Sequence, residues 1–339
     1  MPSRSFLVAA LLVILGTAYA AYWHLMADRL EQGIERWAAD QRAQGLEAGW
    51  SDLAIDGFPL SLRARFAAPR LIGQEGDLPW SWQGEALTLE AQPWRLTRIR
   101  FAGEGTQSAR IAGQRIVFGA VEGAVRLDGR GRMTEAEATA ARLAFAPGAT
   151  AELDGATAES LRLAARLPEA PPRGHTEPGL TVEADLAGLV IASRRPLPVE
   201  GPADLSFRAR MMGALPTPPD RRGLAAWRDD GGTLEIERLA LDWSPLSLRA
   251  SGTLALDTAL QPIGALSAAL SGHGPLLQKL VAMGWVRPQN ARIAGIAFAL
   301  LEKPGADGQP ALNAPVTIQD GYLNIGPARL LPLPRIVWN

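Results

Sequence analysis

The stretch LALDWSPLSLRA, residues 239–250, alternates apolar with polar or small side chains on both sides of a turn that contains proline. Residues 53–64, LAIDGFPLSLRA, repeat it with nine of twelve positions identical. Alternation with a period of two is typical of strands that bury one face of a sheet. Each copy is therefore predicted to form a strand, a turn and a second strand.

The turn in each copy is built from residue types that suit it, because Asp supports a turn through its side chain and Pro fixes φ. These residues are Asp56, Gly57 and Pro59 in the first copy, and Asp242 and Pro245 in the second. The simplest account of the repeat is two related sheet units, residues 46–167 and 179–339. Coincidence among strands rich in Leu, Ala and Arg is the alternative.

The same alternation marks further strands after Gly45. It is clearest in residues 87–90, 99–101, 125–127, 181–186, 205–208 and 234–241. Charged residues at the alternate positions indicate antiparallel strands with one solvated face. Asp320-Gly321 predicts a two-residue hairpin near the C-terminus.

Helical patterns return only near the C-terminus. Residues 275–284 place four apolar side chains on one helical face, and a second helix is predicted over residues 288–301, with proline in its first turn. We expect these two helices to pack on the sheet as a hairpin. The Pro-rich segments 168–178 and 215–223 are predicted to be extended loops. The expected fold class is mainly β (α+β), a large antiparallel sheet with a C-terminal helix pair, preceded by one N-terminal transmembrane helix.

The N-terminus contains an apolar run, residues 6–23, that carries no charge. At about 1.5 Å per residue, such a helix spans roughly 27 Å, close to the thickness of a bilayer core. Positive charge favours the cytoplasmic side, so we expect the tip (residues 1–5, with Arg4) in the cytoplasm and residues 46–339 in the periplasm. This predicts a single-pass protein of the inner membrane.

The apolar run leads into an amphipathic stalk, residues 24–45, without a break in the helical pattern. Its apolar stripe consists of Met26, Leu30, Ile34 and Trp37. A helix that leaves the membrane in this way favours an uncleaved anchor. The alternative is a signal peptide that is cleaved after Ala20, at the end of an A-x-A sequence.

Composition excludes several classes of function. The net charge of −1 gives no basic surplus for nucleic acid, and the absence of cysteine excludes disulfides and thiolate chemistry. His24, His175 and His273 lack the spaced partners of a metal site. Asp229-Asp230 is expected to be a hairpin turn, and Glu135 and Glu137 to be solvated. We therefore expect no enzyme activity, no metal and no cofactor, and the residues singled out are structural turn motifs.

Several segments in their order along the chain resemble the DUF2125 family of uncharacterised envelope proteins, found mainly in alphaproteobacteria. They are the N-terminal helix with its stalk, residues 57–71, 87–101, 227–257 and the helix pair, and residues 315–334. No reaction is assigned to that family, so no catalytic residue carries over. More distantly, strand units that begin with Gly-Phe-Pro are similar to those of AsmA-like and DUF945-like envelope proteins. AsmA-like members are thought to hold lipid in a β-groove.

The resemblance and the one-sided strands together imply a non-enzymatic envelope protein that binds lipid or another amphiphile along an apolar sheet face. Ten tryptophans fit such a groove, although aromatic residues are also common in ordinary cores. The alternative is a periplasmic scaffold that binds another envelope protein, and a hydrolase is a third hypothesis. Lipid binding requires that the helices 275–301 leave the apolar face open.

Overall fold

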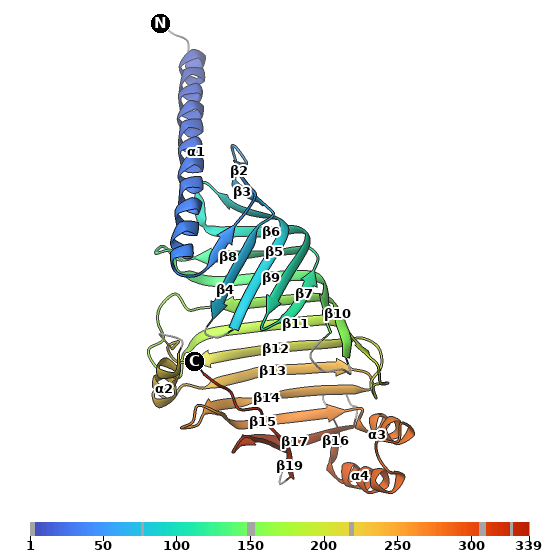
Figure 1. Cartoon of the computed structure of the whole chain (residues 1–339). Coiled ribbons are helices and arrows are strands. Elements are labelled where there is room, and N and C mark those ends of the chain that lie inside the picture. Colours follow the sequence, from blue (N-terminus) through green and yellow to red (C-terminus); the bar gives the residue numbers. More distant parts are fainter. Residues whose placement is uncertain are drawn as a thin grey trace. The chain divides into compact units, whose positions relative to one another are not determined.

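The computed structural model describes residues 4–75, 78–147, 153–216, 220–304, 310–325 and 328–338. Strands make up 54% of the chain and helices 21%, and the strands pair in antiparallel fashion (Figure 1). The predicted fold class is therefore confirmed. Residues 1–3 of the predicted tip and residues 217–219 of the predicted loop lie outside the described residues.

Contacts between backbones group the chain into two compact units, Met1–Met133 and Thr134–Asn339, called unit 1 and unit 2 below. This grouping does not bear on the relationship predicted between residues 46–167 and 179–339, which stays a prediction.

Unit 1 consists of the N-terminal helix α1 (Arg4–Ala43) and a sheet built around two long strands. Its strands are β1 (Glu47–Gly49), β2 (Asp52–Asp56), β3 (Leu62–Ala67), β4 (Arg70–Glu75), β5 (Leu78–Gln92), β6 (Arg95–Ile111), β7 (Gln114–Phe118) and β8 (Val121–Leu127). The central pair is β5 and β6. One edge of β5 pairs with β3 and β4, and the far edge of β6 pairs with β7 and β8.

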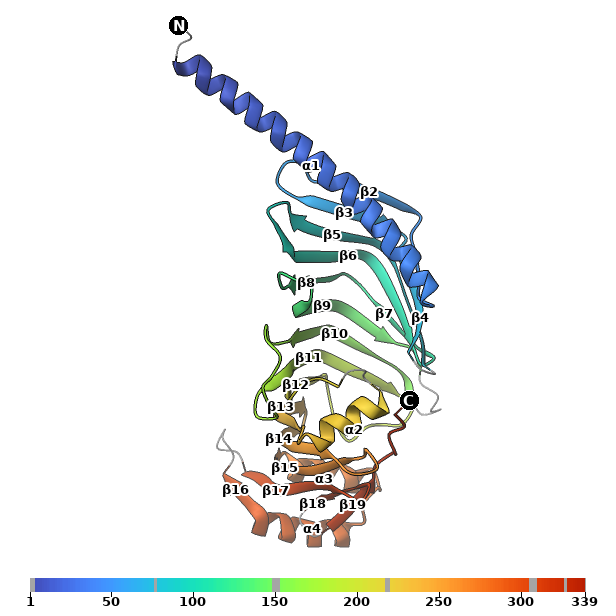
Figure 2. The ribbon, with the colours of Figure 1, turned by 90° about the vertical axis from the view of Figure 1, so that its left-hand side faces the viewer.

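Helix α1 is one unbroken helix of 40 residues that covers both the predicted anchor and the predicted stalk. It is long and apolar enough to cross a membrane, and near the N-terminus such a helix is either a single-pass anchor or a signal sequence. Its C-terminal part contacts β1, β2 and β3 and runs past the hairpin of β2 and β3 (Figure 2). The apolar stripe predicted for the stalk is wrong at Trp37. Trp37 is 47% exposed, and Ala38 takes the buried place because it continues the four-residue spacing of Leu30 and Ile34.

Unit 2 is a meander of antiparallel strands with three helices. Its strands are β9 (Met133–Phe145), β10 (Leu153–Arg166), β11 (Pro178–Ser193), β12 (Ala203–Met212), β13 (Leu234–Trp243), β14 (Leu246–Leu256), β15 (Pro262–Ser271), β16 (Glu302–Pro304), β17 (Pro310–Gln319), β18 (Tyr322–Ile325) and β19 (Ala328–Pro332). Strands β9 to β15 pair in sequence order, and β17 follows β15. The far edge of β17 carries β16 and β18.

The predicted helix pair forms α3 (His273–Ala282) and α4 (Pro288–Leu301), between β15 and β17 along the chain. The two helices contact each other, and α4 contacts β17. Figure 1 shows them at the ends of the strands rather than across the sheet. The described helices therefore do not lie across the face of the sheet. The C-terminal segment after β19 crosses β13 to β15 in the view of Figure 1, and Trp338 donates to the Leu260 carbonyl.

A third helix in unit 2, α2 (Arg221–Asp229), corrects two predictions. The predicted loop 215–223 contains its start, and Asp229-Asp230 lies at its C-terminal end instead of in a hairpin turn. The local signal is Asp220, whose side chain accepts a hydrogen bond from the Gly223 N–H and so caps the helix. Trp227 holds the helix in place, because it is buried and its indole N–H donates to the Met212 carbonyl.

The polar face of unit 2 carries a ladder of ion pairs across four strands. Arg166 contacts Glu135 at 3.1 Å and Glu183 at 2.9 Å, and Arg208 contacts Glu183 at 3.0 Å. Glu135 is half-buried and paired rather than solvated, which corrects the prediction for that residue. Burial alone would raise the pKa of Glu183, but hydrogen bonds and charge from Arg208 and Arg166 outweigh it and hold the pKa below its usual value.

We predict that Glu183→Gln lowers the melting temperature of the full chain in detergent at pH 7 by about 1–3 °C. Because the folded pKa of Glu183 is lowered, its stabilisation is present above pH 4.5, the ordinary pKa, and is lost as pH falls below that value. The difference between variant and wild type should therefore shrink by pH 3.

Asp185→Asn is the matched control. This carboxylate is exposed on the same strand and face, and it has no ion pair in the described part of the chain. Melting curves that change equally in the two variants, or a Glu183→Gln effect that is independent of pH, would contradict the stabilising role of the ladder.

Candidate functional site

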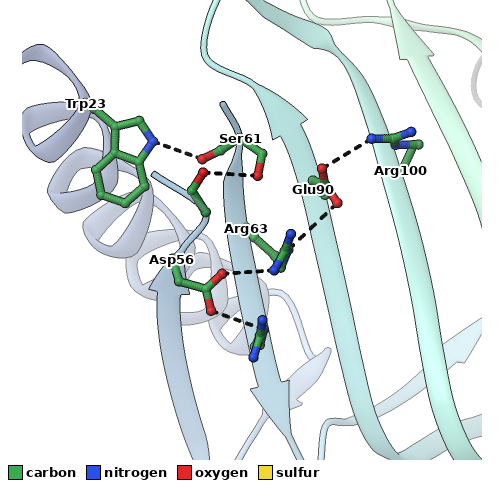
Figure 3. Close-up of polar contacts among 8 residues, drawn as sticks. Trp23, Asp56, Ser61, Arg63, Glu90 and Arg100 are labelled. Carbon is green, nitrogen blue, oxygen red and sulfur yellow. Dashed lines mark hydrogen bonds and ion pairs between the residues drawn. The ribbon is translucent and has the colours of Figure 1, made fainter. Parts of the chain in front are cut away.

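The first copy of the repeated phrase forms the turn that holds α1 against the sheet of unit 1 (Figure 3). Trp23 is 4% exposed, and its indole N–H donates to the Ser61 carbonyl at 2.9 Å. Phe58 lies edge-on to Trp23, with ring centroids 5.5 Å apart, and stacks on His24. A buried tryptophan needs a partner for its N–H. The turn therefore provides both that partner and an aromatic contact.

The turn itself depends on Gly57, which has a φ of 104°. A Cβ at this position would lie 2.7 Å from the Ser61 carbonyl oxygen, so a larger residue would open the turn. Beside it, Asp56 forms ion pairs with Arg63 and Arg65, and Glu90 joins Arg63 to Arg100 (Figure 3). Arg63 and Arg65 alternate along β3 with the buried Leu62, Ala64 and Phe66, so these two arginines lie on the other face of the strand.

The second copy of the phrase forms the hairpin between β13 and β14 in unit 2. Asp242 pairs with Arg249 at 2.7 Å, as the equivalent Asp56 pairs with Arg63 at 3.3 Å. Burial alone would raise the pKa of Asp242, but hydrogen bonds from Ser247 and Arg249 outweigh it and lower the pKa. The two hairpins pair their strands in different register. Asp56 lies opposite Arg63 in the first copy, whereas in the second copy Asp242 lies opposite Ser247, two residues before the equivalent Arg249.

The remaining residues singled out from the sequence lie in the same kind of position. Pro59 and Pro245 each follow a cis peptide bond within their turns. Asp320 and Gly321 join β17 to β18, and both have positive φ, as a two-residue hairpin requires. These residues shape turns, and the structure does not bring them together into one cluster.

An apolar groove of about 300 Å³ lies between α1 and the sheet of unit 1, and we call it the stalk groove. Met26, Leu30 and Ile34 line it from the helix. Leu62, Ala64, Leu89, Ala91, Leu96 and Ile99 line it from the sheet, with Arg29 and Glu90 as the charged members. This volume is at the lower end of the range for ligand sites, and apolar walls with few charges are typical of them.

The apolar face of unit 2 has a continuous row of leucines that the sequence analysis missed. Seven leucines lie directly opposite one another on successive strands: Leu161, Leu186, Leu205, Leu241, Leu248, Leu270 and Leu312. At about 4.8 Å between strands, this leucine row extends over roughly 29 Å. A second apolar row runs beside it, from Leu163 through Phe207 and Leu239 to Ala314.

The side chains of these rows are only partly covered. Leu163 is 47% and Leu205 36% exposed, and the other members of the leucine row are half-buried. Among the described helices, α2 lies at the ends of the strands, and α3 and α4 pack on each other and on β17. Contiguous apolar surface of this kind marks a site of interaction with another molecule.

Polar groups that could support catalysis or bind metal are sparse in the described part of the chain. No cluster of three His, Asp or Glu residues suited to a metal ion occurs there. His273 does have a partner that the sequence did not predict, because its Nε2 lies 2.8 Å from a carboxylate oxygen of Glu302. The ring is 6% exposed and packs edge-on against Phe298. Together these contacts join the start of α3 to the end of α4.

The chain belongs to the DUF2125 family, described as uncharacterised proteins conserved in bacteria, whose model matches residues 23–334. The family resemblance deduced from the sequence is thus confirmed over nearly the whole chain. Its extension to alphaproteobacteria and to AsmA-like proteins stays a prediction. No curated protein matches the chain.

We predict that Trp23→Ala releases the C-terminal part of α1 from the sheet, because removal of a buried tryptophan costs about 3–5 kcal/mol. Limited trypsin digestion of the full chain in detergent, followed by mass spectrometry, should show faster cleavage after Arg29, Arg36 and Arg42. Trp37→Ala is the matched control on the same helix, with an expected effect within about 0.5 kcal/mol. Equal cleavage of both variants would show that Trp23 does not hold the helix.

Proposed function

We propose that this DUF2125 protein is a single-pass envelope protein that stays anchored by α1 and binds lipid or another amphiphile along its apolar sheet faces, without catalysis. The N-terminus lies in the cytoplasm and the strands lie in the periplasm. The observation that carries the proposal is the leucine row, an apolar track across seven strands that the described helices leave open.

Retention of the anchor is supported by contacts on both sides of the possible cleavage point after Ala20. Tyr19 donates its hydroxyl hydrogen to the Pro59 carbonyl, and Trp23 donates to the Ser61 carbonyl. Cleavage would remove the first contact and would leave the second only three residues from a free end. A signal peptide needs no such contacts with the mature protein, whereas an anchor that positions a sheet does.

The dimensions of the apolar surfaces fit an acyl chain. The leucine row extends over roughly 29 Å, and the neighbouring row makes the track two side chains wide. On the opposite face, Arg166, Arg208 and Arg249 form ion pairs with acidic partners and keep that side in water. The stalk groove supplies a second apolar surface, which lies directly beside the helix that crosses the membrane.

A second candidate function, a scaffold that binds another envelope protein, is favoured by one observation on α4. Ile293 and Ile296 lie three residues apart on this helix and are 69% and 66% exposed. Trp285, in the turn before the helix, is 55% exposed. Exposed apolar residues at this spacing are typical of a helix that docks on a protein partner.

Site-specific photo-crosslinking in cells tests lipid binding. With a benzophenone amino acid in place of Leu205, in the leucine row, we expect adducts with lipid mass. The matched control is the neighbouring Ser206, which lies on the polar face opposite Asp185. Equal lipid labelling at both positions, or protein adducts alone at Leu205, would overturn the proposal. Protein adducts at Ile293 together with no lipid at Leu205 would favour the scaffold.

Retention of the anchor is tested separately. An epitope tag at the N-terminus should remain on the membrane-bound protein at its full mass, because α1 is not cleaved. Ala20→Leu, which would block a signal-peptidase site, should leave the mass unchanged. Loss of the tag from the wild-type protein and its recovery in Ala20→Leu would show that α1 is a signal sequence.

A further inference from the structure

Two turns of unit 1 reach the apolar part of α1 and expose large apolar side chains there. The turn between β2 and β3 contributes Phe58 and Leu60, which are 51% and 68% exposed. The turn between β5 and β6 contributes Trp94 at its tip and Leu96 just beyond, which are 62% and 47% exposed. We call these four residues the membrane rim.

Hydrogen bonds to α1 fix the level of both turns along the helix. Tyr19 donates to the Pro59 carbonyl, and Tyr22 donates to the Pro93 carbonyl at 3.3 Å. Both tyrosines belong to the uncharged run 6–23. Tyr19 lies four residues before Trp23, or about 6 Å further into the run. Interfacial segments are buried about 5–10 Å at the boundary of headgroups and acyl chains. With Trp23 at the membrane surface, the offset of about 6 Å falls within that range.

Basic side chains lie directly behind the second turn. Arg95, Arg98 and Arg100 line a hollow of about 210 Å³, together with Glu90, Ala91 and Gln92. Glu90 already contacts Arg63 and Arg100, and neither Arg95 nor Arg98 has an ion pair in the described part of the chain. Arg95 and Arg98 are both exposed, so an anion outside the protein can reach their guanidinium groups.

Apolar tips at interfacial depth and arginines behind them match one occupant, a leaflet that contains anionic phospholipid. Tips of this kind enter the interface, and guanidinium groups bind phosphate in bidentate fashion. A soluble protein partner fits less well, because the span of α1 places the bilayer itself against these turns. The protein as a whole is almost neutral, with a net charge of −1. Any electrostatic attraction to anionic lipid therefore comes from the arginines of this hollow.

We propose that the membrane rim inserts into the leaflet from which the strands emerge, and that Arg95 and Arg98 bind the phosphate groups of anionic phospholipid there. The inference rests on retention of the anchor but not on lipid carriage along the leucine row. Because Leu96 lines both the rim and the stalk groove, the groove opens next to the leaflet.

The test uses the full chain in nanodiscs of phosphatidylcholine with about one-third phosphatidylglycerol. The chain has no cysteine, so Leu60→Cys or Trp94→Cys gives a single site for an environment-sensitive fluorophore. Both side chains are mostly exposed, and two sites guard against a variant that does not fold. We expect blue-shifted emission and several-fold stronger quenching by spin-labelled lipid than at Ile111→Cys. Ile111 is 53% exposed at the opposite end of β6 and is the matched control.

The arginines are tested in the same discs. Arg95→Gln combined with Arg98→Gln should reduce insertion of the rim, with a factor of about five for each arginine. The reduction should disappear in discs of phosphatidylcholine alone. Arg110→Gln, at the far end of β6, should have no effect in either lipid.

Two results would overturn the inference: lipid quenching at positions 60 and 94 no greater than at 111, or labels shielded from water without quenching by lipid. If the rim inserts equally well without Arg95 and Arg98, these arginines do not form a phosphate site. Loss of wild-type protein from the membrane fraction would instead show that the anchor, and with it the proposed function, has failed.

Discussion

The contact between Trp23 and the turn of β2 and β3 sets the position of α1, and the accessible surfaces of unit 1 depend on it. Trp23 is buried, and its N–H has a partner in the Ser61 carbonyl. Because a helix is rigid over this length, docking at Trp23 also fixes Met26, Leu30 and Ile34 above the sheet. These side chains cover the sheet only in part, and the remainder is the stalk groove. A different position of Trp23 would either close the groove or remove its wall.

In unit 1, α1 covers part of the apolar sheet face. In unit 2, no described helix covers the apolar face in this way. Its leucines align from strand to strand, but the described helices lie at the ends of the strands. Exposed apolar surface costs about 25 cal/mol per Å² relative to burial. The opposite face is polar, and its ion pairs link neighbouring strands. A sheet that keeps such a face open is suited to a ligand that covers it.

Local signals in the sequence were enough for many of the strands and for one pair of helices. Period-two alternation marks β11 and β13, among others, and Asp320-Gly321 has the positive φ values that its hairpin needs. Pro288 begins α4 where expected. The short helix α2 was missed because its pattern covers only nine residues and its chief signal is one capping aspartate, Asp220.

The leucine row and the stalk groove could not be predicted in the same way, because they depend on register and docking. Alternation shows that Leu186 and Leu205 each lie on the apolar face of a strand. Whether they lie opposite each other depends on irregularities in the ladder, such as the one between Leu186 and Leu189. Likewise, the partner of Trp23 is 38 residues away, and no local pattern identifies it.

The repeated phrase shows how one turn sequence was fitted to two surroundings. The two copies keep the Asp–Arg ion pair, and they differ at Ile55, Gly57 and Phe58, which are Leu241, Trp243 and Ser244 in the second copy. Phe58 contacts Trp23 and His24. Trp243 instead donates to the Gly201 carbonyl within unit 2. Phe58 is thus a position that differs and meets α1, but the shared positions Pro59 and Ser61 also accept hydrogen bonds from that helix. The Asp–Arg ion pair is therefore common to both hairpins, and the ring of Phe58 adapts the first hairpin to α1.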